Sequence, residues 1–178
     1  MGRIICIFSL LFIVCTAHAG GIDDKRAAVI ETAQSQIGVR EATGRNDGVQ
    51  IELYLEAVNL KKGNPWCAAF VAWCFRQCNI STPLSGYCPV WFRGNAVVYK
   101  RGSGTSFSNS NIRCGDVFGI YFPEMKRIAH QGLIESIQKD CIITVEGNTN
   151  DMLSREGDGV YRKRRQARQI YMVASYIQ

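Results

Sequence analysis

The chain has 178 residues, with 21 Lys and Arg against 15 Asp and Glu, and a formal net charge of +6. This length suits one domain with a full hydrophobic core, and no repeat, low-complexity tract or long linker indicates a second domain. Much of the positive charge lies in YRKRRQAR, residues 161–168, a run typical of a solvated strand face. The charge also suits an anionic polymer, either a cell wall or a nucleic acid.

Residues 1–19 have the pattern of a secretory signal peptide. Arg3 precedes a short apolar run, and the small-x-small motif 17–19 offers a cleavage site. A membrane anchor would normally need about 20 apolar residues, and lipidation at Cys15 is a weaker alternative. We therefore expect an exported protein, periplasmic or extracellular, with one domain over 20–178 and no membrane span after cleavage. Export makes nucleic acid the poorer choice of partner.

Four helices are predicted in the first part of the chain, at 26–38, 49–60, 63–78 and 90–100. After a loop, short β-type runs follow; they lie at 116–122, 130–137, 141–147, 159–165 and 170–177. Helices followed by a run of strands indicate an α+β fold with an antiparallel sheet of about five strands.

The third predicted helix begins in GNPWCAAFVAWCFRQC. Asn64 is a candidate cap and Pro65 suits the first turn, which places Cys67 where backbone N–H groups favour a thiolate. Cys74 and Cys78 lie within about 20° of the direction of Cys67 around the helix. The alternative is that Cys67 is a core or disulfide cysteine.

Six cysteines follow the predicted signal, an even number that allows up to three disulfides in an exported protein. They are Cys67, Cys74, Cys78, Cys88, Cys114 and Cys141. A zinc site is disfavoured, because His130 is the only histidine after the signal and no close C-x-x-C pair exists.

A cysteine nucleophile needs a base and a group that orients the base. If residues 138–140 form a hairpin loop, Ile137 lies opposite Cys141 and His130 opposite Asn148. His130, Glu146 and Asn148 then project from one face of the hairpin. A slip of one residue would move every side chain to the other face, and a lone histidine is more often structural.

The motifs PWCAAFVAWC, CGDVFGIYF, AHQGLIE and ITVEGNTN together resemble the CHAP and NlpC-type branch of papain-like cysteine peptidases. The match includes the Gly115-Asp116 pair and runs from about residue 26 to 178. The resemblance implies a helix that carries the nucleophile, packed on an antiparallel sheet. It also implies cleavage of peptidoglycan amide bonds, by an N-acetylmuramoyl-L-alanine amidase or a stem-peptide endopeptidase.

Carried over residue by residue, Cys67 is the nucleophile and His130 the base and acid, while Glu146 and Asn148 are candidates to orient the imidazole. Many CHAP sequences have Gln before the cysteine, whereas Trp66 stands here. That difference leaves the second oxyanion donor open. Trp66, like Trp73 and Trp91, is expected to be a core or groove-lining aromatic, and Trp66 is also the candidate for contact with a glycan or stem peptide.

The resemblance further implies a monomer that needs no metal or organic cofactor and acts on the anionic wall polymer. Three alternatives remain: a non-catalytic wall-binding module on the same fold, an antibacterial effector with the same chemistry, and a cysteine peptidase or transferase acting on protein or lipid.

Overall fold

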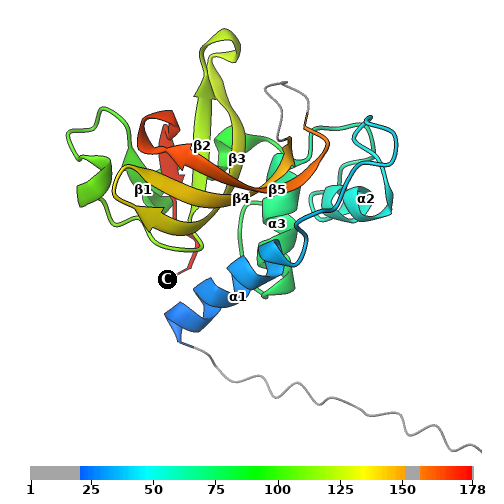
Figure 1. Ribbon diagram of the computed structural model, residues 1–178, viewed down its shortest axis with the longest axis horizontal. Helices are drawn as coiled ribbons and strands as arrows, with labels where there is room; N and C mark the ends of the chain where they lie inside the picture. The colour runs from blue at the N-terminus through cyan, green and yellow to red at the C-terminus, as the bar shows by residue number, and fades with distance from the viewer. Residues whose placement is uncertain (1–20, 151–156, 178) are drawn as a thin grey trace, which may run out of the picture.

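A computed structural model describes residues 21–150 and 157–177, which fold into three α-helices and a six-stranded antiparallel sheet (Figure 1). The α+β class is thereby confirmed, with six strands where about five were predicted. The predicted signal peptide lies outside the described residues. Within 21–150 and 157–177, no helix has the length and apolar character needed to cross a membrane.

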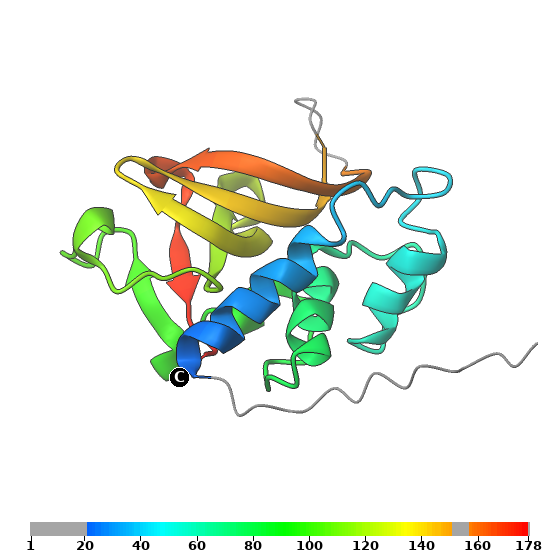
Figure 2. The same cartoon turned by 60° about the horizontal axis from the view of Figure 1, so that its bottom comes forward.

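The helices are α1 (Ile22–Gln34), α2 (Val49–Glu56) and α3 (Cys67–Gln77). Helix α3 is the central one: it packs against α1 and α2 and also against two strands, β3 and β4. Its sequence explains this position, because Ala, Phe, Val and Cys surround the helix and eight of its eleven residues are buried. The three helices lie together on one side of the sheet (Figure 2).

The strands are β1 (Val97–Lys100), β2 (Val117–Phe122), β3 (Arg127–Gln138), β4 (Cys141–Thr149), β5 (Gly159–Gln166) and β6 (Met172–Ala174). Their order across the sheet is β1-β6-β2-β3-β4-β5. Five short 3₁₀ turns lie in the connections: η1 (Cys88–Trp91) and η2 (Gly94–Ala96) between α3 and β1, and η3 (Phe107–Asn109), η4 (Pro123–Met125) and η5 (Ala167–Gln169) between strands.

The predicted fourth helix at 90–100 is wrong. Gly94 has a φ of +58°, which interrupts any helix there, and the chain forms the turns η1 and η2 instead. The β-branched and aromatic residues that follow suit a strand, and Tyr99 pairs with Val173 of β6. This strand, β1, is the sixth one.

The β3–β4 hairpin differs from the prediction at its turn and agrees with it farther along. The turn contains only Lys139 and Asp140, so that Gln138 rather than Ile137 pairs with Cys141. The register then shifts by one residue between Ile134 and Ser136. Beyond this bulge Leu133 pairs with Val145, which is the predicted register. His130 and Glu146 consequently share a face of the sheet.

Candidate active site

Helix α3 begins at Cys67, two residues later than the predicted cap implies. The side chain of Asn64 bonds to the carbonyl of Lys61 and not to the helix, so the expectation that Asn64 caps it is wrong. Trp66 occupies the N-cap position, and its backbone N–H donates to Oδ1 of Asn148 at 3.0 Å. The start of the helix is therefore held by a strand residue 82 positions away.

The thiol of Cys67 lies among hydrogen-bond donors although only 5% of the residue is exposed. Its Sγ is 3.6 Å from Sγ of Cys88. The hydrogen bond from Cys88 lowers the pKa of Cys67, burial raises it, and the His130 imidazole and the Gln131 backbone N–H lower it further. Together these interactions lower the pKa of Cys67 well below the ordinary thiol value, which favours the thiolate.

Cys88 shows the opposite behaviour. Its hydrogen bond to Cys67, its burial and the negative charge of Cys67 raise the pKa of Cys88 well above the ordinary value, whereas the positive charge of Arg127 lowers it. The opposite pKa shifts favour Cys88 as the protonated member of the pair.

The imidazole of His130 connects Cys67 to a carboxylate. Its Nε2 lies 2.7 Å from Oε2 of Glu146, and the two side chains are 12% and 0% exposed. Burial alone would lower the pKa of His130, but its interactions with Cys67 and Glu146 raise it to about 9. Because Glu146 occupies Nε2, Nδ1 is the nitrogen left for Cys67. The arrangement favours a thiolate–imidazolium pair.

Glu146 is held on its far side by Arg165 and Thr144. Arg165 Nε lies 2.8 Å from Oε1 and Nη2 lies 2.6 Å from Oε2, a bidentate pair, and the hydroxyl of Thr144 donates to Oε1 at 2.6 Å. Burial raises the pKa of Glu146, but the charges of Arg165 and His130 outweigh it and lower the value to about 2. The carboxylate therefore stays ionised.

Sequence reasoning missed Arg165 and Thr144. The available signal was strand alternation, because Thr144 and Glu146 of β4 point to the same face of the sheet. Arg165 of β5 pairs with Ile142 of β4, which lies two residues before Thr144 and therefore on that face too. The sequence YRKRRQAR gives no sign that Arg165 differs from the other arginines in the run. Its role depends on how β5 pairs with β4 and could not be predicted without that register.

The side chain of Asn148 makes its hydrogen bonds to groups other than His130. Its φ of +54° turns the side chain toward the start of α3, where Oδ1 accepts from Trp66 and Nδ2 donates to Oδ1 of Asn46 at 3.2 Å. Trp66 is fully buried, and its indole N–H donates to Glu41 at 2.8 Å. Trp66 therefore presents no surface to a ligand in this structure. Glu41 and Asn46 lie in the segment that joins α1 to α2.

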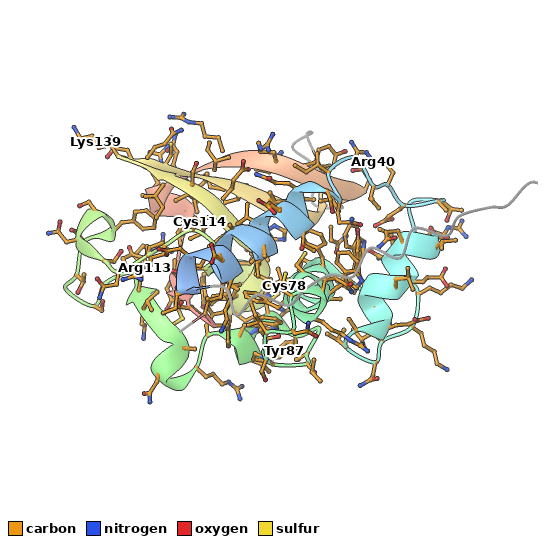
Figure 3. All side chains as sticks on the ribbon, turned by 90° about the horizontal axis from the view of Figure 1, so that it is seen from below. Arg40, Cys78, Tyr87, Arg113, Cys114 and Lys139 are labelled. Atoms are coloured by element: carbon orange, nitrogen blue, oxygen red, sulfur yellow. The ribbon has the colours of Figure 1, made fainter. Side chains whose placement is uncertain are left out.

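All six described cysteines are free thiols. Burial raises the pKa of Cys74 well above its ordinary value. Figure 3 labels Cys78, at the end of α3, and Cys114, in the loop before β2. Within the described parts of the chain, no three side chains of His, Cys, Asp or Glu gather in a way that could hold a metal ion.

A thiolate at a helix N-terminus, beside an imidazole that a buried carboxylate orients, is an arrangement suited to acyl transfer. The unpaired N–H groups of the first helical turn can stabilise an oxyanion. Comparison with protein-family models, with curated proteins and with solved structures finds no match for this chain.

Proposed function

We propose that this protein is an exported cysteine hydrolase of the papain-like, CHAP or NlpC type that cleaves amide bonds of peptidoglycan. The observation that carries the proposal is the meeting of Cys67, His130 and Glu146, from one helix and two strands, in a single chain of buried polar groups. A module that only binds the wall has no use for a thiolate beside an oriented imidazole.

The mechanism follows from this geometry. The Cys67 thiolate attacks the carbonyl carbon of the scissile amide, and the backbone N–H of Cys67 stabilises the oxyanion that forms. His130 transfers its proton to the leaving nitrogen, so the C–N bond breaks and a thioester remains. Water then attacks the thioester with His130 as the base, which releases the acid and restores the thiolate. Glu146 keeps the imidazole oriented throughout.

Peptidoglycan as the substrate rests on the sequence resemblance, the predicted signal peptide and the net charge of +6, which suits an anionic polymer. The amidase and the endopeptidase share every step above and differ only in the amide bond that is cut. An antibacterial effector would use the same chemistry on the wall of another cell.

The test is incubation of the purified protein with intact peptidoglycan, with released fragments identified by mass spectrometry. We expect the wild type to release fragments whose masses name the bond, and Cys67→Ala to release none. Cys78→Ala is the matched control, because Cys78 follows the last residue of the same helix, at the end away from Cys67, and this variant should cut as the wild type does. Wild-type protein that sediments with the wall without cutting it would overturn the hydrolase and favour the wall-binding module.

A further inference from the structure

The proposed nucleophile has a second thiol beside it that the mechanism does not use. Cys67 is the first residue of α3 and Cys88 the first residue of η1, and their sulfurs are 3.6 Å apart. No other pair of sulfurs among the described residues is in hydrogen-bonding contact: Cys78 contacts Thr32 and Cys141 contacts Gln138. The contact is therefore particular to the site.

The separation is short enough for a covalent bond to form with a small movement. A disulfide has an S–S length of about 2.05 Å, so the two sulfurs need to approach by about 1.5 Å. Cys88 follows a stretch without regular secondary structure, residues 79–87, and belongs to a turn of only four residues. Side-chain rotation with a small shift of this turn can close the gap without disturbing α3.

We propose that Cys67 and Cys88 form a reversible disulfide, a modification site at which peroxides switch off the nucleophile. The loss of activity that the disulfide causes rests on the proposed function, whereas the formation of the disulfide does not. The first step is attack of the Cys67 thiolate on hydrogen peroxide: an S–O bond forms, the O–O bond breaks, and the hydroxide released takes the proton of the His130 imidazolium to become water.

In the second step the sulfur of Cys88 attacks the sulfenic acid of Cys67. The S–S bond forms, the S–O bond breaks, and the departing hydroxide takes the proton of Cys88 to give a second water. Two thiols and one peroxide thus give one disulfide and two waters. A dithiol reductant reverses the reaction by exchange.

The surroundings favour this order of events. His130 and the Gln131 N–H stabilise the thiolate at Cys67, which makes it the sulfur that is oxidised first. The negative charge of Cys67 is one cause of the raised pKa of Cys88, and it disappears when Cys67 becomes a neutral sulfenic acid. The positive charge of Arg127 then favours loss of the Cys88 proton as the S–S bond forms. Exposed fractions of 5% and 3% suit a small oxidant.

The experiment treats the purified protein with hydrogen peroxide, blocks remaining thiols, and maps peptides by mass spectrometry before and after a dithiol is added. We expect a Cys67–Cys88 linked peptide that the dithiol removes, with wall cleavage lost and regained in step. Cys114→Ser, which removes a half-buried cysteine elsewhere, should form the same link. Cys88→Ser should instead take Cys67 to the sulfinic acid, which the dithiol cannot reverse.

A sulfinic acid at Cys67 in the wild type, or a link from Cys67 to any other cysteine, would overturn the proposal. Since the wild-type map alone decides this, a Cys88 variant that fails to fold leaves the test intact. If the reversible link forms in a protein that never cuts the wall, the modification site stands and the proposed hydrolase function fails. If peroxide abolishes wall cleavage but no link forms, the hydrolase function stands and the modification site fails.

Discussion

At the scale of single residues, the site is a row of alternating charges that runs from the Cys67 thiolate through His130 and Glu146 to Arg165. Each charge is stabilised by the opposite charge beside it. Glu146 is fully buried, so its negative charge would destabilise the folded protein if His130 and Arg165 were absent. The imidazolium is favoured on both sides, which explains why the pKa of His130 is raised to about 9 in spite of burial.

Glu146→Gln keeps the shape of the side chain and removes its charge. We expect the pKa of His130 to fall from about 9 toward its ordinary value of 6.5. Under the proposed function, the release of wall fragments should also slow about 10²-fold or more. His130 is the only histidine of the described residues, so NMR titration of its ring protons gives a direct reading. A titration curve that coincides with that of the wild type would contradict the assigned role of Glu146.

Arg165→Met would leave the buried carboxylate without its bidentate partner. We expect the free energy of unfolding to fall by about 3 kcal/mol, as is usual when one member of a largely buried ion pair is removed. The Arg165 side chain is only 19% exposed, which limits solvent screening.

The control for that variant is Arg164→Met, the exposed neighbour on the opposite face of β5, which should change the unfolding free energy by less than about 0.5 kcal/mol. Urea unfolding measures both. Equal losses in the two variants would show that Arg165 contributes only general surface charge.

At the scale of elements, local pattern predicted the existence of α1 to α3 and of the later strands. The first helix was placed at 26–38, four residues too late at each end, because it spans Ile22–Gln34. The register of β3 and β4 at Leu133 was predicted although the turn was not, because the bulge after Ile134 offsets the one-residue difference in loop length. Bulges depend on packing of the whole sheet, and nothing in a single strand's sequence indicates them.

The cap of α3 could not be predicted for a related reason. Asn64 has the local signature of a cap, but Asn148 supplies the oxygen that the start of the helix uses, from a strand far along the chain. Tertiary contact has replaced a local one. The same holds for Arg165, whose partner is decided by strand pairing.

Asn148 does two things for α3, and substitutions separate them. Asn148→Gly permits the φ of +54° and removes the acceptor for the Trp66 N–H, which we expect to cost about 1 kcal/mol. Asn148→Ala also strains the backbone, for about 1 kcal/mol more. Urea unfolding measures this order, and the rate of Cys67 alkylation should fall in both variants. An alanine variant as stable as the wild type would contradict it.

At the scale of the whole molecule, a buried arginine joins the two ends of the described chain. Arg26 of α1 bonds through Nη1 to Asp116 at 2.8 Å, and through Nη2 to the carbonyl of Ile177 at 2.9 Å. Asp116 also accepts from the backbone N–H of Arg113. The Gly-Asp pair before β2 therefore fixes α1 and the C-terminal segment to the sheet, and Asp116 acts in packing and not in the candidate site.

The free energy of unfolding should depend on the protonation of Glu146 at low pH. Its pKa in the folded protein, about 2, is below the ordinary value of 4.5. The unfolded chain therefore takes up the proton first as the pH falls. The stabilisation that Glu146 provides is complete above about pH 4.5 and is lost as the pH falls toward 2.

Comparison of the wild type with Glu146→Gln isolates this contribution from the other carboxylates. A shift from 4.5 to about 2 corresponds to at most about 3 kcal/mol, and Gln retains part of it through hydrogen bonds to Arg165 and His130. We expect the wild type to be the more stable protein at pH 6 and the difference to shrink steadily below pH 4.5, because a protonated Glu146 resembles the amide. Urea midpoints across this range measure it. A difference that stays constant from pH 6 to pH 3 would mean that Glu146 is not the ionised centre of the site.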